Sequence, residues 1–254
     1  MEIDNSTIVI TGASRGIGEA AARHLAKRGA RVFLAARDTG SLAGIADELT
    51  TQGHSAWPVD CDVTDPAQVE ALVTIALERT GRLDVLVNNA GLIDPIARIA
   101  DSETHSWGQV IDVNLKGVYH GLRFAIPAML AGGGGTIVNI SSGAATSALE
   151  GWSHYCASKA AVRSLTGVAD KEYRDRGLRV FGLSPGTVAT RMQEEIRASG
   201  INPVSRLDWS AHIPADWVAE AIAWLLTDAA DRHRGTDFSL KTEEGRRAVG
   251  LPGL

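Results

Sequence analysis

The sequence has little of what marks secreted, membrane or nucleic-acid-binding proteins. Its 254 residues include only two cysteines, Cys61 and Cys156, so neither a disulfide framework nor a CxxC metal pair is present. No apolar run approaches the roughly 20 residues that a membrane span needs. The start, MEIDNSTIVI, lacks the basic region and long apolar stretch of a secretory signal. We therefore expect a cytoplasmic protein that does not associate with membranes.

The sequence also lacks an excess of positive charge and any metal-ligand pattern. The net charge of −5 provides no basic footprint for a nucleic acid, so we expect no such partner. The seven histidines are scattered, without an HxxxH pair or an adjacent cluster of carboxylates. We therefore predict no catalytic metal.

What the sequence does contain is a regular alternation of short apolar runs and longer amphipathic stretches. The short runs are rich in β-branched residues and apolar on both faces, as are parallel strands covered by helices on both sides. The expected strands are Thr7–Thr11, Arg31–Ala36, Ser55–Asp60, Asp84–Asn88, Gly135–Ser141, Leu178–Ser184 and Thr236–Leu240. The expected helices are Gly16–Arg28, Leu42–Gln52, Pro66–Arg79, His105–Leu130, Ser153–Arg174 and Pro214–Leu226. This order predicts an α/β fold: a Rossmann-like, doubly wound parallel sheet with helices on both faces, in one domain spanning residues 1–254.

A glycine-rich turn follows the first expected strand, in TIVITGASRGIGEAAARHLAKRG. Gly12, Gly16 and Gly18 have the spacing G-x3-G-x-G. Glycine allows unusual backbone angles and a close approach of a ligand, and the helix that follows offers free N–H groups to a pyrophosphate. A plain strand-to-helix turn is the alternative. The position at the first strand–helix junction of an α/β chain favours dinucleotide binding.

Seven segments together resemble the short-chain dehydrogenase/reductase family, in its single-domain branch. They are TGASRGIG (11–18), DVTD (62–65), NNAG (88–91), VNLKG (113–117), NISS (139–142), YCASK (155–159) and SPGTVAT (184–190). They occur in the family's order and spacing, from about residue 5 to about residue 227. The resemblance implies an NAD(P)-dependent oxidoreductase that acts on CH–OH groups.

The segment YCASK places Tyr155 and Lys159 one helical turn apart, on the same face. The resemblance implies that Tyr155 exchanges a proton with the substrate oxygen, as acid in reduction and as base in oxidation. It also implies that Lys159 lowers the pKa of Tyr155 and holds the nicotinamide ribose. Ser142 is expected to stabilise the developing alkoxide, with Ser141 in support. The matching Asn114 would kink its helix and hold a water that links Lys159 to solvent.

The same resemblance implies a set of cofactor contacts. Asp62 is expected to accept from the adenine amino group, a backbone group near Val188 to fix the carboxamide, and Thr190 to contact phosphate. The full set comprises Gly12, Ser14, Arg15, Gly16, Ile17, Gly18, Arg37, Asp62, Val63, Asn88, Ala90, Gly91, Tyr155, Lys159, Pro185, Gly186, Val188 and Thr190.

The stretch LAARD, at the end of the second expected strand, bears on the choice between NADP(H) and NAD(H). An NAD enzyme normally carries an acid at the last strand position to bind the ribose 2′-OH, and that position here is Ala36. Arg37 follows, where its guanidinium can take a 2′-phosphate, and Arg15 can approach the same group. We therefore expect NADP(H). NAD(H) stays the alternative, because Asp38 would serve it if the strand ended later.

The expected substrate region comprises residues 92–98, 143–153 and 187–210, with 191–212 as a mobile lid. Leu149, Trp152, Met192 and Trp209 predict a partly apolar pocket. No cluster of basic residues occurs in these segments, which favours an uncharged ketone or secondary alcohol. A 3-oxoacyl thioester on a carrier protein is the nearest alternative. A dinucleotide-sensing protein without catalysis is a third, although it would be expected to lack the Tyr or the Lys.

Three further expectations concern the neighbours of Tyr155, the face of its helix and the C-terminal segment. His154 could touch the substrate, although a loop role is more common, and Cys156 is expected to fill space near the site. Ala157, Ala160 and Ala161 smooth one helix face, and in the family that helix packs on its copy in a second subunit, so a homodimer or homotetramer is expected. The charged tail over residues 241–254 departs from the family pattern, which weakens the case for a tetramer.

Overall fold

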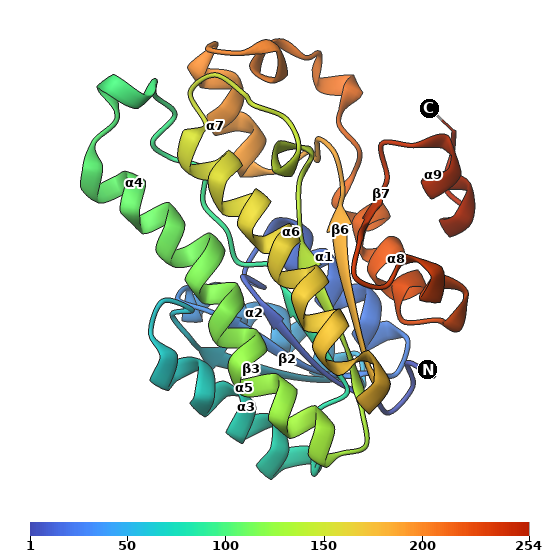
Figure 1. The fold of residues 1–254 in the computed structure, drawn as a ribbon. Coiled ribbons are helices and arrows are strands. Elements are labelled where there is room, and N and C mark those ends of the chain that lie inside the picture. The colour runs from blue at the N-terminus through green and yellow to red at the C-terminus, as the bar shows by residue number, and fades with distance from the viewer. Residues whose placement is uncertain (254) are drawn as a thin grey trace.

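Seven strands pair in parallel into one sheet, in the order β3-β2-β1-β4-β5-β6-β7 (Figure 1). This computed structural model describes residues 1–253. The strands are β1 Thr7–Thr11, β2 Arg31–Ala36, β3 Ser55–Asp60, β4 Val85–Asn88, β5 Gly135–Ile140, β6 Leu178–Ser184 and β7 Asp237–Ser239. All seven were predicted from sequence, with ends that differ by at most one residue. The Rossmann-like, doubly wound α/β fold is confirmed.

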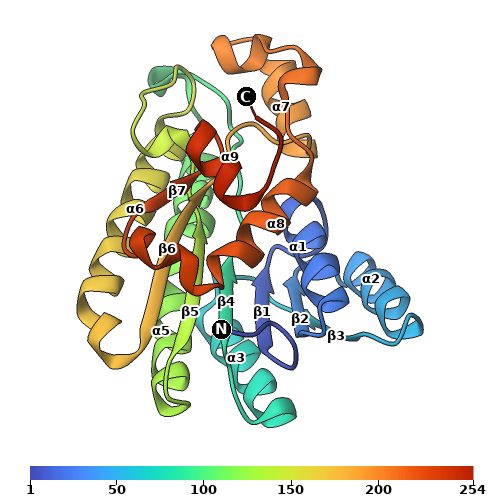
Figure 2. The same ribbon diagram turned by 90° about the vertical axis from the view of Figure 1, so that its right-hand side faces the viewer.

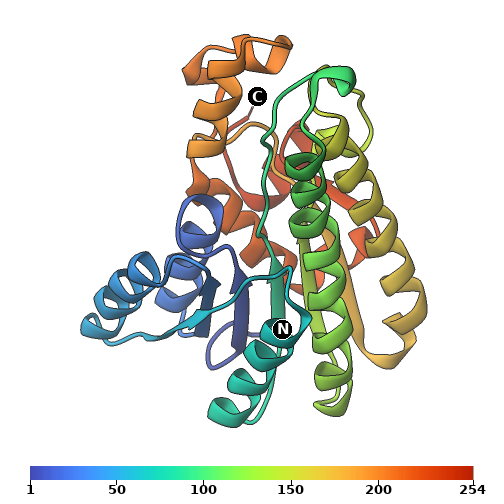
Figure 3. The same cartoon turned by 90° about the vertical axis from the view of Figure 1, so that its left-hand side faces the viewer.

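The helices cover both faces of the sheet. They are α1 Gly16–Lys27, α2 Thr39–Thr51, α3 Pro66–Thr80, α4 Thr104–Ile111, α5 Gly117–Ala131, α6 Ser153–Tyr173, α7 Arg191–Ser199, α8 Ala215–Leu225 and α9 Glu243–Val249. Helices α1, α2 and α8 pack on one face (Figure 2), and α3, α5 and α6 pack on the other (Figure 3).

Alternation along the buried strands explains the two helix layers. In β1, Ile8 and Ile10 belong to the core beneath α1, α2 and α8, whereas Val9 between them belongs to the core beneath α3, α5 and α6. All three side chains are fully buried. Successive side chains of a strand point to opposite faces, so an apolar run with no polar alternation needs cover on both sides.

The order of the strands fixes where a ligand can bind. The chain winds from β1 outward to β2 and β3, and then returns to place β4 on the other side of β1. Loops after β1 and β4 therefore diverge at the carboxyl edge of the sheet and leave a crevice between them. Open α/β sheets bind their ligands at such a reversal point.

The long helix predicted over His105–Leu130 is not continuous. A π-helical turn, Asp112–Lys116, separates α4 from α5 and contains Asn114. The side chain of Asn114 is fully buried and forms two hydrogen bonds with the backbone of Leu92, accepting from its N–H at 2.7 Å and donating to its C=O at 2.9 Å. These contacts tie the turn to the loop after β4, so the structure has a π turn at the place where a kink was expected, and the kink itself stays a prediction.

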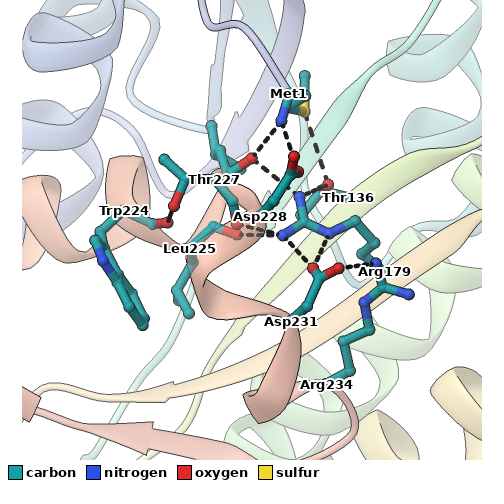
Figure 4. A network of polar contacts seen from close by, with 10 residues as sticks. Met1, Thr136, Arg179, Trp224, Leu225, Thr227, Asp228, Asp231 and Arg234 are labelled. Carbon is teal, nitrogen blue, oxygen red and sulfur yellow. Dashed lines mark hydrogen bonds and ion pairs between the residues drawn. The ribbon is translucent and has the colours of Figure 1, made fainter. Parts of the chain in front are cut away.

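A largely buried arginine joins β6 to the end of α8. Arg179 in β6 donates to the carbonyl oxygens of Leu225, Leu226 and Thr227, and forms an ion pair with Asp231 at 2.7 Å (Figure 4). The last carbonyls of a helix have no partner within the helix, and a cation is favoured there by the helix dipole. Arg179 therefore caps α8 and fixes it against the sheet.

The charged C-terminal segment that departs from the family pattern folds back on the same chain. Helix α9 lies beside α8 (Figure 2), and the guanidinium of Arg246 lies 5.3 Å from the ring centroid of Trp217. Arg246 also donates to the carbonyl oxygen of Leu240 at 3.0 Å. The tail thus closes one side of the molecule and holds the loop after β7 in place.

Candidate functional site

A cavity of about 990 Å³ opens at the carboxyl edge of the sheet, at the reversal point between β1 and β4. Its walls come from the segments after β1, β2, β3, β4, β5 and β6, from α6 and from α7. The predicted residues that line it are Gly12, Ser14, Arg15, Gly16, Ile17, Arg37, Asp62, Val63, Ala90, Gly91, Ser142, Tyr155, Lys159, Pro185, Gly186, Val188 and Thr190. One cavity therefore holds residues from every motif of the chain, including Val113 of the segment around Asn114.

The glycine turn needs glycine for steric reasons. Gly12 has φ +64°, and a Cβ at this position would lie 2.8 Å from the Cα of Ala90, closer than side chains tolerate. Asn89 secures the turn by donating from its side chain to the carbonyl oxygens of Thr11 and Gly12. Asn89 was not predicted as a site residue, although it is the second residue of the NNAG segment.

The start of α1 suits the phosphates of a dinucleotide. Arg15 precedes the helix, and no side chain caps the N–H groups of its first turn. Thr190 lies opposite, its Cγ2 3.3 Å from where a Cβ on Gly16 would be. Uncapped N–H groups at a helix start and the positive end of its dipole bind anions. The residues present therefore fit a pyrophosphate group.

At the adenosine end, β2 ends at Ala36, as predicted. Arg37 follows with its side chain 64% exposed, and its Nη1 lies 3.7 Å from Oδ2 of Asp62. Burial alone would raise the pKa of Asp62, but hydrogen bonds from Thr64 and the charge of Arg37 lower it. Asp38 accepts from the backbone N–H and the hydroxyl of Ser41, so it caps α2.

The three predicted catalytic residues Ser142, Tyr155 and Lys159 all line the cavity and lie near one another. The ammonium of Lys159 lies 5.6 Å from the centroid of the Tyr155 ring and donates to the carbonyl oxygen of Ile140 at 2.7 Å. The phenol ring packs edge-on against Trp152, with 5.6 Å between ring centroids. Buried neighbours thus hold the phenol of Tyr155 and the ammonium of Lys159 in place.

The protein around Tyr155 does not by itself favour a phenolate. Burial raises the pKa of Tyr155, and a hydrogen bond with Ser142 opposes that rise only in part. In the protein alone, burial outweighs every other influence on this pKa, and the lowering expected from Lys159 stays a prediction. Burial also lowers the pKa of Lys159 to about 8, against the attraction of Asp237.

Asp237, at the start of β7, interacts with Ser141 and Lys159 and was not predicted. It accepts from the hydroxyl of Ser141 at 2.7 Å, and Nε of Arg163 lies 3.9 Å away. Burial raises its pKa, although Ser141, Arg163 and Lys159 all oppose the rise. The support expected of Ser141 thus takes a physical form, a link between the residue before Ser142 and a carboxylate that attracts Lys159.

The low pKa of Lys159 predicts a pH-dependent cost of burying it. Below pH 8 the amine of Lys159 is charged in both the folded and the unfolded protein. Between pH 8 and 10.5 this amine binds more protons in the unfolded protein than in the folded one. The folded state of wild type therefore becomes more stable as the pH rises through this range. We expect Lys159→Met to be more stable than wild type at pH 7, and to lose up to about 3 kcal/mol of that advantage by pH 10.5. Urea unfolding of the cofactor-free proteins at both pH values measures this change.

The exposed Lys171, on the same helix, provides the matched control. Lys171→Met should change stability equally at the two pH values, because its amine is solvated in both states. Comparing each variant with wild type removes the shared contributions of Tyr155 and Cys61, whose raised pKa values act in the opposite direction. A pH-independent effect of Lys159→Met would show that the ammonium carries no burial penalty.

Three of the residues predicted to be catalytic or to bind the cofactor do not line the cavity. A Cβ on Gly18 would lie 2.3 Å from the carbonyl oxygen of Gly12, so Gly18 permits the close packing of α1 rather than ligand contact. The side chain of Asn88 is buried and donates to Asn139 at 2.9 Å, as part of a polar chain within the core. Asn114 holds the loop at Leu92, and its predicted water stays a prediction.

The substrate end of the cavity is largely apolar. Leu149, Trp152 and Met192 line it as predicted, together with Ile196 of α7. Trp209 does not line it, because its ring is 38% exposed and stacks on His212 instead.

Two neighbours of Tyr155 act within the fold. His154 is fully buried and donates from Nε2 to the carbonyl oxygen of Ile93 at 2.7 Å, which excludes direct contact with a ligand in the cavity. Cys156 is partly buried among the apolar residues around Tyr155, in line with its expected filling role. Among residues 1–253, no cluster of histidine, cysteine and carboxylate side chains could hold a metal ion, and no helix could span a membrane.

The sequence is similar to that of known proteins over most of its length. Residues 6–200 match the short chain dehydrogenase family. Cyclohexanol dehydrogenase from Acinetobacter sp. (strain SE19) is 32% identical over 240 residues, which cover 93% of this chain and 94% of that protein. Cis-4-hydroxycyclohexanecarboxylate dehydrogenase from Sinomonas cyclohexanicum is 39% identical over 232 residues, covering 87% and 89%.

A solved structure shows a similar fold. A variant of actinorhodin polyketide ketoreductase, crystallised with NADPH, superposes with a TM-score of 0.85 at 31% identity. The superposition covers 94% of this chain and 96% of that one.

Proposed function

This chain belongs to the short-chain dehydrogenase family, and we propose that it interconverts a ketone and a secondary alcohol with NADP(H). The relatives compared above are oxidoreductases of alcohols and ketones. The observation that carries the proposal is the meeting of Ser142, Tyr155 and Lys159 in the cavity that also contains the glycine turn. Bound NADPH would supply a hydride to the carbonyl carbon. The chain itself must then bind the carbonyl oxygen and provide its proton.

Tyr155 is proposed as the group that transfers this proton. Because burial raises its pKa, the phenol is protonated at neutral pH and is ready to act as an acid in carbonyl reduction. The hydroxyl of Ser142 would donate to the same oxygen and stabilise charge as it develops. In the oxidation direction, Tyr155 must act as a base, and the positive charge of oxidised nicotinamide together with Lys159 would favour its phenolate.

The surroundings of Arg37 support a preference for NADP(H). Strand β2 ends at Ala36, which leaves no acid at its last position. Asp38 lines the cavity, but it caps α2, and both of its carboxylate oxygens already accept hydrogen bonds from Ser41. Arg37 and Arg15 both line the cavity, where two guanidinium groups suit a 2′-phosphate.

The apolar wall of Leu149, Trp152, Met192 and Ile196 supports a compact hydrocarbon skeleton as substrate. The relatives named for cyclohexanol and cis-4-hydroxycyclohexanecarboxylate make six-membered cyclic alcohols and ketones the first candidates. A 3-oxoacyl thioester is the second candidate, because the polyketide ketoreductase shares the fold over nearly its whole length.

The exposed face of α6 supports a homodimer. Ala157 and Ala160 are exposed there with Val168, which is 48% exposed, and Tyr119 of α5 is 51% exposed. A face with small and apolar exposed side chains suits close packing against a second copy. A homotetramer is the alternative.

A substrate panel tests the proposed reaction. Purified protein is incubated with cyclohexanone, 4-oxocyclohexanecarboxylate and an acetoacetyl thioester, each with NADPH and with NADH, and nucleotide absorbance is followed. We expect oxidation of NADPH with at least one cyclic ketone. Turnover of the thioester alone would favour the second candidate, and nucleotide binding without any turnover would indicate a dinucleotide-sensing protein.

A further inference from the structure

A second cation lies at the catalytic end of the cavity and takes no part in the chemistry described above. Lys241 lines the cavity although it follows β7, far along the chain from every substrate segment predicted from sequence. Segments 92–98, 143–153 and 187–210 carry no basic cluster, which is why the sequence favoured an uncharged substrate. The fold adds a cation from outside those segments, and unlike Arg191 it is not paired with a carboxylate.

Two glycines give Lys241 its position. A Cβ on Gly186 would lie 2.9 Å from Cγ and 3.5 Å from Cδ of Lys241, so the lysine stem occupies the space that a side chain at residue 186 would fill. A Cβ on Gly143 would lie 3.8 Å from Nζ, so the ammonium lies over Gly143. Both glycines also line the cavity, and no side chain of either stands between the ammonium and its interior.

The backbone of Lys241 is fixed by the sheet. The N–H of Leu240 donates to the carbonyl oxygen of Ser184 at 3.1 Å, and the N–H of Lys241 donates to the hydroxyl of Ser239 at 3.2 Å. Arg246 of α9 holds the carbonyl oxygen of Leu240. The departure of this segment from the family pattern therefore places a lysine at a defined point of the cavity wall.

The ammonium of Lys241 has no partner within residues 1–253. No hydrogen bond or ion pair involves its side chain, whereas Lys159 donates to Ile140 and Arg191 pairs with Glu195 at 3.3 Å. The side chain is exposed and therefore solvated. An unpaired, anchored cation on the wall of a ligand cavity is available to an anionic group of the ligand.

Distance along the chain limits how far this cation is from the reacting oxygen. Gly143 follows Ser142 directly, and consecutive Cα atoms are about 3.8 Å apart. Three further lengths add to this spacing: the side chain of Ser142, a Cα–Cβ bond at Gly143, and the 3.8 Å from that Cβ position to Nζ of Lys241. Together they limit the distance between the Ser142 hydroxyl and the Lys241 ammonium to about 12 Å. A small substrate can therefore present its carbonyl to Ser142 and Tyr155 and a second group to Lys241.

We infer that Lys241 binds a carboxylate on the substrate, so that the enzyme acts on cyclic oxo and hydroxy acids in preference to their uncharged analogues. The inference rests on the proposed function, since it assigns the substrate class of the same site. The apolar wall takes the carbon skeleton, and Lys241 orients it by holding the carboxylate. A phosphate of the cofactor is the competing anion for this lysine.

The test compares 4-oxocyclohexanecarboxylate with its methyl ester, which keeps the skeleton and removes the charge. In wild type, kcat/KM should be higher for the acid. Lys241→Met should lower the acid-to-ester ratio of kcat/KM about tenfold, mainly by raising KM for the acid. This is the effect of losing a charge-assisted hydrogen bond that is partly screened by solvent. Lys241→Arg should restore most of the ratio, because it restores the cation.

Lys27→Met is the matched control. Lys27 is exposed at the far end of α1, about 18 Å along the helix from the cavity, and its loss removes the same charge. The control should leave the ratio at its wild-type value. The dissociation constant of NADPH, from nucleotide fluorescence, should be the same in Lys241→Met and wild type.

Two results would overturn the assignment of Lys241. An unchanged acid-to-ester ratio in Lys241→Met, in an enzyme that reduces the ester, would leave the proposed function intact and exclude a carboxylate site at Lys241. Weakened NADPH binding with an unchanged ratio would assign the lysine to a cofactor phosphate. Absence of turnover with every ketone in wild type would instead reject the proposed function itself.

Discussion

Tyr155→Phe is expected to reduce kcat for carbonyl reduction by roughly 10²- to 10⁴-fold while NADPH binding is retained. Phenylalanine keeps the ring that packs edge-on against Trp152 and removes only the hydroxyl that is proposed to donate the proton. The fall should appear in kcat and in kcat/KM together, because proton transfer takes place in the transition state. Steady-state rates with the best ketone of the panel, together with the dissociation constant of NADPH, measure both parts of the expectation.

Tyr119→Phe is the matched control for this substitution. Tyr119 lies on α5 with 51% of its surface exposed, outside the cavity, so loss of its hydroxyl should leave kcat unchanged. Turnover by Tyr155→Phe at the wild-type rate would reject Tyr155 as the acid/base. Loss of NADPH binding in that variant would instead show that the phenol is needed to hold the cofactor.

Arg37→Ala is expected to weaken NADPH binding by about 10- to 100-fold and to leave NADH binding nearly unchanged. A guanidinium that donates to a phosphate contributes a charge-assisted hydrogen bond, which is stronger than one between neutral groups. NADH carries no 2′-phosphate and so has nothing to lose at this position. Titration of both nucleotides into wild type and variant, followed by nucleotide fluorescence, gives the four dissociation constants.

Ionic strength and a second arginine make this test sharper. The NADPH affinity of wild type should fall with added salt more steeply than that of Arg37→Ala, because Arg37 is 64% exposed and its charge is screened. Arg28→Ala removes an exposed charge after α1, outside the cavity, and should leave the preference for NADPH unchanged. Equal affinity of wild type for NADH and NADPH would contradict the assignment of Arg37.

The end of β2 shows how far local sequence can be taken. Its apolar run stops at Ala36, and the strand stops there too, because the residues that follow are polar and cannot be buried between the two helix layers. The same local information could not show what Asp38 does. Its carboxylate is directed by Ser41, within the first turn of the next helix, and only the structure shows this hydrogen bonding.

The expected phenolate illustrates a different limit. Tyr155 and Lys159 were paired from their spacing, and the structure places them in one cavity. Their pKa values depend on burial, which depends on every element packed around them, and burial shifts both groups toward their neutral forms. Spacing in the sequence carries no measure of that burial.

The sequence by itself determined the fold, the glycine turn and the pairing of Tyr155 with Lys159. Each of these was inferred from residues that are close along the chain: apolar periodicity, closely spaced glycines after a strand and one turn of a helix. The tertiary structure alone decided the roles of Asp237 and Lys241. Asp237 reaches Ser141 across 96 residues because β7 pairs with β6, and Lys241 reaches the cavity through the same pairing. Strand order and register set such contacts, and no local pattern of residues records them.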